Sequence, residues 1–433
     1  MFVSLRIAKL FALAALALRF ISCASAAPGD ENWAGGFGVP PAGNGVNNCV
    51  FALAAGSGNI YAGGFFNVAG SAVATNIARW NGSSWSAVSG GVDDQVNVIA
   101  VLGTNVYVGG YFTHAGPVSA IAIASNGDVY VGGIFTNAGA VAANYVARWN
   151  GTSWSALGSG LNDQVNAITV SGTNVYVAGY FTTAGGAAAN LVARWNGVSW
   201  SSLGSGTANG VKGAAVDALA GSGNDVYAGG TFTNAGGIAV SNVAKWNGTS
   251  WAAVGSGLGR PGDFVAALTV SGTNVYAGGV FTNTGAVAAN NIASWNGVGW
   301  SVLGSGVVAG ASPAPVYALT TNAPNVYVGG CFTTAGGKPS NNFAVWNEAT
   351  IPVAITKVAQ EGNNMRITWN TVAGGTNFVQ ATRGTASGSY SNNFSDISTG
   401  IVVPGSGAVT TNFVESGGAT NRPARYYRVR LVQ

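Results

Sequence analysis

Short apolar runs that alternate with turn residues recur along most of the chain. Within one unit, residues 165–205, four β-rich runs have the sequences VNAITV, NVYVAGYF, LVARWNG and SWSSLGS. Runs of this length with alternating apolar positions predict β-strands, and the glycine and asparagine residues around them predict turns. The pattern therefore predicts an all-β protein built from repeated four-stranded units.

The spacing of the repeat indicates how these units assemble. Aligning the chain on the tyrosine of the NVYVGG run gives intervals of 46, 23, 46, 51, 49 and 51 residues between Tyr61, Tyr107, Tyr130, Tyr176, Tyr227, Tyr276 and Tyr327. A period of roughly 50 residues is typical of propellers and solenoids, and four strands per unit make a propeller blade. We therefore expect a β-propeller over residues 27–349, with seven blades of which one is truncated, or alternatively six blades and an inserted hairpin.

A motif with two tryptophans ends most of the units. In ARWNGTSWSALGSG, residues 147–160, Trp149 and Trp154 flank Asn150-Gly151, a pair that favours positive φ angles in a tight turn between strands. Because each blade must bury both faces against its neighbours, we expect these indoles to pack between blades rather than to bind sugars. The same pair recurs at Trp80/Trp85, Trp195/Trp200, Trp246/Trp251 and Trp295/Trp300.

Two departures from the repeat predict how the ring closes. Residues 111–130 omit the third and fourth strands, which halves the interval between Tyr107 and Tyr130. The last unit ends at FAVWNEAT, residues 343–350, without a fourth strand, whereas DENWAGGFG, residues 30–38, resembles that strand. We expect the N-terminal segment to complete the last blade, which would close the ring and cover two strand edges.

These motifs resemble a known repeat family. A VYVGG strand that ends in a glycine pair, followed by a loop, a strand and a tryptophan, resembles the kelch-type propeller, including the central domain of galactose oxidase. The GGxFTxAGG…ARWNGTSWSALGSG pattern is similar to repeats in secreted bacterial proteins and in fungal cell-surface polarity markers. The resemblance covers about residues 31–349. It implies a fold and says little about function, because propellers host many chemistries.

The repeat stops at Ile351, where the composition changes. The segments MRITWNT, NFVQATRG, TTNFVES and ARYYRVRLV alternate as the strands of a small β-sandwich do, with Trp369 as a core residue. Residues 350–433 suit a fibronectin- or immunoglobulin-like module. The resemblance is to the accessory domains found at the ends of secreted bacterial proteins.

The first 26 residues predict an export signal. Arg6 and Lys9 precede an apolar stretch over residues 10–18, and small residues follow at 24–26. We expect cleavage after Ala26 and a secreted, extracellular or cell-surface protein. No segment approaches the roughly 20 apolar residues that a membrane span requires.

The chain has three cysteines, one in the predicted signal and two in the repeat region. A lipoprotein signal ending at Cys23 is the alternative, although Phe20 fits its leucine position poorly. If Cys23 is removed with the signal, Cys49 and Cys331 remain, at the start of a first strand and the end of a second strand in the first and last blades. A closed ring makes those blades neighbours, and an exported protein can keep a disulfide. The alignment leaves open whether the two Cα atoms come within the roughly 7 Å that a bridge requires.

The charge excludes one class of partner. The chain has 17 Lys and Arg against 13 Asp and Glu, and removal of the signal lowers the basic count to 14. Neither the repeat region nor the C-terminal segment has the clustered basic residues of a nucleic-acid-binding protein. We expect a monomer that binds no nucleic acid.

The candidate binding residues lie in loops that differ among the repeats. Loops before the first strand and after the second strand of a blade share one face, and there the exceptional residues are Asp93, Asp94, Asp163, Arg260 and Asp263. Carboxylates could act in acid–base catalysis or bind calcium, but aspartates are also favoured in turns for local hydrogen bonds. No other metal or cofactor is expected. The copper of galactose oxidase needs two histidines, and the chain has only His114.

Three hypotheses about function follow. The first is a secreted, non-catalytic propeller that presents variable loops to a protein or a glycan. The second is a carbohydrate-active enzyme, a lyase or glycosidase, that uses the loop aspartates. The third is a structural component of the cell envelope, for which low charge and many small residues would suffice.

Overall fold

The chain is described over most of its length by a computed structural model. The expected export signal and His114 lie outside the described residues. Within the described part, no helix is long and apolar enough to cross a membrane. The described ranges are 29–112, 116–204, 209–285, 287–310, 314–348, 354–372, 376–383, 395–399, 401–402, 408–416 and 425–432.

Five antiparallel sheets each contain the four strands of one repeat. The prediction of an all-β protein with four-stranded units is confirmed in them. Their strands are β1 (Val50–Gly56), β2 (Asn59–Gly64), β5 (Ile77–Trp80) and β6 (Trp85–Ala87); β9 (Val118–Ile123), β10 (Val129–Gly133), β13 (Val146–Trp149) and β14 (Trp154–Ala156); β15 (Val165–Ser171), β16 (Asn174–Gly179), β19 (Val192–Trp195) and β20 (Trp200–Ser202); β21 (Val211–Ser222), β22 (Asp225–Ala235), β24 (Val243–Trp246) and β25 (Trp251–Ala253); and β26 (Phe264–Ser271), β27 (Asn274–Val280), β30 (Ile292–Trp295) and β31 (Trp300–Val302).

Short strands fill the loops between the second and third strands of the repeats. They are β3 (Val68–Ala69) with β4 (Ala72–Val73), β11 (Asn137–Ala138) with β12 (Val141–Ala142), β17 (Thr183–Ala184) with β18 (Ala187–Ala188), β28 (Asn283–Thr284) with β29 (Val287–Ala288), and β35 (Thr334–Ala335) with β36 (Lys338–Pro339), while β23 (Ile238–Ala239) pairs with β22. A further short strand, β32 (Val307–Val308), precedes β33 and pairs with β35. A 3-10 helix, η1 (Asp30–Asn32), precedes the first strand.

Two sheets of the repeat region are incomplete. Strands β7 (Val96–Leu102) and β8 (Asn105–Gly110) form a hairpin that no other described strand extends. Strands β33 (Val316–Asn322), β34 (Asn325–Gly330) and β37 (Phe343–Asn347) form a sheet that lacks its own fourth strand.

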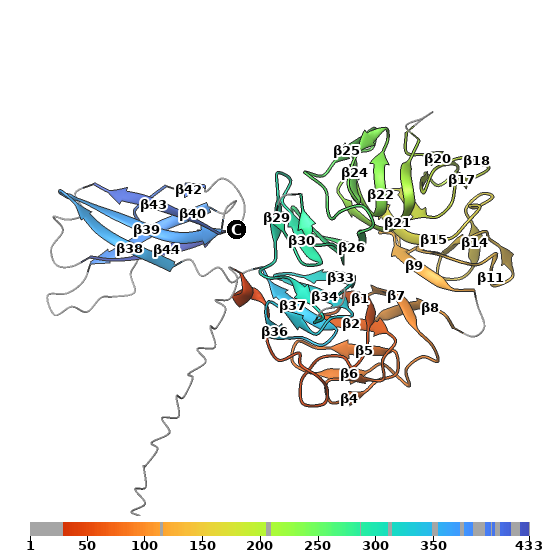
Figure 1. The fold of residues 1–433 in the computed structure, drawn as a ribbon, viewed down its shortest axis with the longest axis horizontal. Coiled ribbons are helices and arrows are strands. Elements are labelled where there is room, and N and C mark those ends of the chain that lie inside the picture. Colours follow the sequence, from red (N-terminus) through yellow and green to blue (C-terminus); the bar gives the residue numbers. More distant parts are fainter. Residues whose placement is uncertain are drawn as a thin grey trace, which may run out of the picture.

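The sheets are arranged in a closed ring, which Figure 1 shows from red through green to blue. The first strand of each repeat contacts the first strand of the next, in the order β1, β7, β9, β15, β21, β26, β33 and back to β1. These first strands line the centre of the ring, and the later strands of each sheet lie successively farther out.

The paired tryptophans pack between neighbouring sheets. The indole Nε1 of Trp200 in the outermost strand β20 donates to the Leu157 carbonyl of the preceding sheet at 2.7 Å. Trp251 donates in the same way to the Leu203 carbonyl at 2.9 Å. The equivalent bonds from Trp85 and Trp300 end at the Asn44 and Val254 carbonyls. Their predicted packing role is confirmed.

The turn between the two tryptophans differs from the one expected. Only Gly151 has a positive φ, at 97°, and Asn150 does not share it. Instead, the Asn150 side-chain oxygen accepts hydrogen bonds from the backbone N–H groups of Thr152 and Ser153, at 2.9 and 2.8 Å. Asparagine is therefore required here for its side-chain acceptor, as in an Asx turn, rather than for a left-handed backbone.

The N-terminal segment completes the last sheet. Trp33 forms an antiparallel bridge with Trp346 of β37, and its indole Nε1 donates to the Leu303 carbonyl at 2.9 Å. The Asp30 carboxylate accepts hydrogen bonds from the backbone N–H and the hydroxyl of Ser305. Trp33 is only 1% exposed, so the segment takes the place of a fourth strand and makes its interblade contact.

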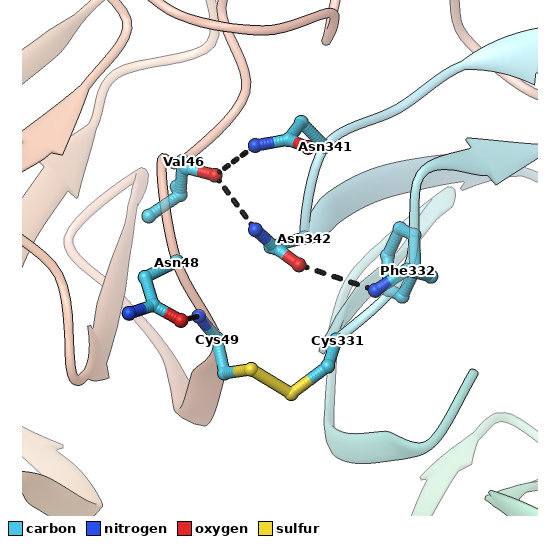
Figure 2. The surroundings of a disulfide bond; sticks show 7 residues. All are labelled: Val46, Asn48, Cys49, Cys331, Phe332, Asn341 and Asn342. Carbon is cyan, nitrogen blue, oxygen red and sulfur yellow. Dashed lines mark hydrogen bonds between the residues drawn. A yellow bond between two sulfur atoms is a disulfide. The ribbon is translucent and has the colours of Figure 1, made fainter. Parts of the chain in front are cut away.

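A disulfide and a carbonyl acceptor join the first and last sheets at the same place (Figure 2). Cys49 directly precedes β1 and Cys331 directly follows β34, and their sulfur atoms are bonded, with the Cα atoms 4.7 Å apart. The side-chain amides of Asn341 and Asn342 both donate to the Val46 carbonyl, at 2.6 and 2.9 Å. Strands far apart in the sequence are therefore fixed side by side.

The C-terminal residues form two further antiparallel sheets. One contains β38 (Ala354–Glu361), β39 (Asn364–Val372) and β43 (Ala408–Glu415), and the other contains β40 (Thr376–Arg383), β41 (Ser395–Asp396), β42 (Ile401–Val402) and β44 (Arg425–Val432). Ile367 and Trp369 from the first sheet and Val379 from the second belong to one buried cluster. Trp369 is fully buried, as the sequence predicts.

Replacing Trp33 with alanine should strongly destabilise the ring. The change removes a buried indole and its bond to Leu303, and such truncations cost about 3–5 kcal/mol. Val39→Ala is the control, because Val39 belongs to the same segment but is 68% exposed. Thermal and urea unfolding should show a large loss for the first variant and almost none for the second. Equal losses would contradict the role of Trp33 in closure.

The purified, exported protein should contain no free thiol from Cys49 or Cys331. Denatured, unreduced protein is titrated with a thiol reagent, and the same sample after reduction is the control. Because the bridge joins residues 282 positions apart, reduction should also lower the melting temperature. Two free thiols before reduction would show that the bridge does not form in solution.

Candidate functional site at the central channel

Each first strand contains a β-bulge at the same position, and the bulged residue lines the central channel. In β15, for example, the pairing with β16 skips Asn166 between Val165 and Ala167. A bulged residue leaves the regular ladder, so its side chain is not fixed by pairing. The seven bulged residues, in ring order, are Phe51, Asn97, Ser119, Asn166, Asp217, Ala266 and Tyr317.

The glycine pair of the repeat makes room for the bulge and for the next sheet. In β10, a β carbon on Gly133 would overlap the Pro117 carbonyl, which directs the chain into the bulge. A β carbon on Gly132 would overlap the Val165 side chain of the following sheet. The second glycine of the motif is thus a requirement of backbone approach at the bulge, whereas the first is replaced by Ala178 in β16.

One side of the channel is polar. Asp217 is half-buried, and the side-chain amide of Asn166 donates to its carboxylate at 2.9 Å. The Asn166 oxygen in turn accepts from the Gln164 amide at 2.7 Å, and Gln95 makes the equivalent bond to Asn97. Burial raises the pKa of Asp217 to about 6, because desolvation disfavours the charged carboxylate more than the bond from Asn166 stabilises it.

The other side of the channel is apolar. The rings of Phe51 and Tyr317 lie 5.2 Å apart at a tilt of 55°, and Ala266 precedes Tyr317 in the ring. Burial raises the pKa of the Tyr317 hydroxyl, so it stays protonated and can donate a hydrogen bond. The channel therefore offers an aromatic surface on one side and amide, hydroxyl and carboxyl groups on the other.

The loop aspartates predicted as binding residues support their own turns. Asp94 and Asp163 accept from the N–H groups of the residues that follow them, at 2.6 and 2.7 Å. Asp263 accepts from the backbone N–H of Arg260 at 2.9 Å. These bonds are the local hydrogen bonds for which aspartates are favoured in turns. Asp93, Asp163 and Arg260 are exposed, while Asp94 and Asp263 are half-buried.

The loop residues and the bulged residues belong to the same face. Asp94, Asp163 and Asp263 each stand three positions before a bulged residue, at Asn97, Asn166 and Ala266. None of the five predicted residues is among those that line the channel. In the case of Asp163, hydrogen bonds connect the two sets, from Asp163 through Gln164 and Asn166 to Asp217.

Sequence reasoning missed Asp217. Its signal was a carboxylate inside the strand VKGAAVDALAGS, at the position where the other first strands carry an amide, a hydroxyl, an alanine or an aromatic ring. In the described residues, Asp217 is the one carboxylate that lines the channel, and no group of three or more His, Cys, Asp and Glu is placed to hold a metal ion.

The closed ring of antiparallel sheets around a channel defines the fold class as a β-propeller. No protein-family model and no curated protein matches the sequence. Among solved structures, the chain is similar to YCF48 bound to a D1 peptide, with 12% identity, a TM-score of 0.32, and 78% of this chain and 92% of that chain covered. It is also similar to the WD40 β-propeller domain of Doa1, with 11% identity, a TM-score of 0.35, and 72% and 96% covered.

The buried carboxyl of Asp217 should make stability depend on pH. Its pKa is about 6 in the folded chain against 3.8 in the unfolded chain, so the folded state binds the proton more tightly between these values. The free energy of unfolding should therefore fall as pH rises from about 4 to about 6, by up to about 3 kcal/mol. Asp217→Asn should remove this dependence and be the more stable protein at pH 7.

Urea unfolding at intervals between pH 4 and pH 8 measures the effect. Asp93→Asn is the matched control, since it makes the same chemical change at an exposed loop position of the same face. It should leave the slope of the wild-type curve unchanged. Parallel curves for wild type and Asp217→Asn would refute the assignment.

Proposed function

We propose that the protein is an exported, non-catalytic β-propeller that binds a protein segment or a glycan over its central channel. The observation that carries this proposal is the variation at the bulge. Strand, turn and interblade positions repeat the same residues around the ring, whereas the seven bulged positions hold six different residue types. Positions that the scaffold leaves free to differ are where a propeller acquires a specific ligand.

The chemistry of the channel limits what the ligand can be. The Asp217 carboxylate and the Asn97 and Asn166 amides favour a ligand with several N–H or O–H groups. The rings of Phe51 and Tyr317 favour an apolar face beside those groups. A sugar ring satisfies both requirements, and so does a peptide with a basic or amide side chain next to an apolar one.

Binding is favoured over glycoside hydrolysis by the number of carboxyl groups. Glycosidases of the common type use two of them, about 5–10 Å apart, as acid and as base or nucleophile. Among the described residues that line the channel, Asp217 has no second carboxylate beside it. A carboxyl group held by an amide, as Asp217 is by Asn166, suits recognition of a hydrogen-bond donor.

Several finer features belong to the same proposal. We count seven blades of kelch type, with β7 and β8 as the truncated one and residues 30–37 as part of the last. The N-terminal signal directs the chain out of the cytoplasm, where the bond between Cys49 and Cys331 can persist. The C-terminal sheets form an immunoglobulin- or fibronectin-like module beside a monomeric propeller.

Screening on glycan and peptide arrays, followed by affinity measurement, tests the function. Asp217→Asn should weaken binding of the selected ligand at least about tenfold, because it removes the charge of the strongest acceptor in the channel. Combined replacement of Asp93, Asp94, Asp163 and Asp263 by asparagine should abolish binding if the ligand also covers the loops. Val198→Thr, at an outer hairpin where Val198 is 84% exposed, is the control and should bind as wild type does.

Two results would overturn the proposal. The first is wild-type affinity in both the Asp217 variant and the quadruple variant, which would place the ligand elsewhere. The second is release of products from a panel of polysaccharides by the wild-type protein and not by Asp217→Asn, which would establish catalysis at the channel.

A further inference from the structure

The hairpin of β7 and β8 has an open edge on its outer side. In the neighbouring sheets, β2 pairs with β5 and β10 pairs with β13, but no described residue pairs with the outer edge of β8. Such an edge presents a row of N–H and C=O groups without partners. Natural edges are commonly protected by charged residues or proline, and NVYVGG, the sequence of β8, contains neither.

The side chains of β8 are also incompletely covered. Val106, Tyr107 and Val108 are half-buried. Their equivalents in the complete sheet, Val175, Tyr176 and Val177 of β16, are 1%, 3% and 0% exposed. The difference is the apolar surface that a third and a fourth strand cover in the other repeats.

Two hydrogen-bonding groups in the neighbouring sheets, the Trp154 indole N–H and the Val88 carbonyl, lack the partners that a complete sheet would supply. Trp154 occupies the position of Trp200, yet its indole N–H donates to no described residue, whereas the Trp200 indole donates to the Leu157 carbonyl. The acceptor for Trp154 would follow the absent fourth strand of the hairpin. On this side of the hairpin, the Trp154 indole N–H therefore has no described acceptor.

The other side of the edge shows the complementary group. The Val88 carbonyl accepts the Gly91 N–H at 3.0 Å and, among the described residues, nothing else. The equivalent Leu157 carbonyl accepts both the Gly160 N–H and the Trp200 indole. Val88 is half-buried where Leu157 is 2% exposed. On one side of the hairpin the Val88 carbonyl therefore lacks the indole donor that other repeats supply. On the other side the Trp154 indole lacks the carbonyl acceptor.

We infer that the open edge of β8 binds an extended segment of a partner protein, which adds an antiparallel strand or hairpin and completes the blade. The pairing of the intact sheet specifies its chemistry. Opposite Val175 and Val177 stand Trp195 and Ala193, so the segment carries a small apolar residue and an aromatic residue two positions apart. Main-chain bonds would supply affinity and these side chains specificity.

The fold already completes one sheet in this way. Residues 30–37 close the sheet of β33, β34 and β37 with Trp33, although they come from the far end of the repeat region. Because that segment is engaged in the last sheet, it is not available to β8. We assign the segment that would complete the sheet of β7 and β8 to another chain.

A peptide with the sequence of residues 146–156, VARWNGTSWSA, tests the inference on the full-length protein. It is the outer hairpin of the adjacent repeat and should fit the open edge. Fluorescence anisotropy should show saturable binding that a scrambled peptide lacks. Hydrogen exchange should slow at residues 105–110 when the peptide is bound and stay unchanged at residues 174–179 of the complete sheet.

Trp154→Phe is the informative variant and Trp200→Phe is its matched control. Loss of the free indole donor should weaken the peptide about fivefold, the effect of one hydrogen bond. Trp200→Phe, whose indole is already bonded to Leu157, should leave peptide binding unchanged.

The inference is overturned if the labelled peptide does not bind, if exchange slows at residues 174–179 instead of residues 105–110, or if both tryptophan variants weaken binding equally. Sedimentation of the wild-type protein decides a further case. A dimer that the peptide dissociates would mean that a second copy of this chain covers the edge, and the partner protein would be excluded as its occupant.

Discussion

The ring depends on how closely each sheet approaches the next one. Near the channel, the first glycine of the VYVGG motif lets a valine of the following sheet lie against the backbone, as Val165 does at Gly132. At the outer wall, an indole N–H reaches back to a carbonyl of the preceding sheet, as Trp200 does to Leu157. The glycine–valine contact near the channel and the indole–carbonyl bond at the outer wall together fix the angle between two sheets. Repetition of that angle brings β33 back to β1.

The last sheet, which contains β33, β34 and β37, differs from the others in how it is joined to its neighbours. The last sheet takes strands from both ends of the repeat region, and the chain joins it to the first sheet through residues 38–49, which lead from the closing segment to β1. Long-range bonds fix this sheet on both sides: Trp33 donates to the Leu303 carbonyl of the preceding sheet, while two asparagine amides donate to the Val46 carbonyl and Cys49 is bonded to Cys331 on the side of the first sheet. Closure therefore reuses the contacts of the repeat, with Trp33 and Asn342 in the places of Trp200 and Asn242, and adds the disulfide.

The sequence predicted those features that depend on spacing, and it failed for those that depend on backbone irregularity. The four-strand period and the packing of the tryptophans follow from intervals between residues, and the N-terminal completion of the last sheet follows from the likeness of residues 30–38 to the missing strand. The bulge does not, because one extra residue reverses the alternation on which a strand prediction rests. For this reason Asp217 could be placed in a strand but not at the channel.

The role of the loop aspartates was also open. A carboxylate that caps its own turn and one that binds a ligand have the same sequence pattern.

The bulge separates the scaffold from the site. A residue in the ladder must fit between two sheets, so its replacement disturbs the ring, whereas a bulged residue lies outside the ladder and can change at little cost to folding. This freedom accounts for the range of side chains from Phe51 to Tyr317 around one channel. It does not account for Asp217, because a half-buried carboxylate with a raised pKa costs stability at neutral pH that an alanine, as at Ala266, would avoid. A residue that the fold does not need and that lowers its stability is expected where binding, rather than folding, determines the side chain.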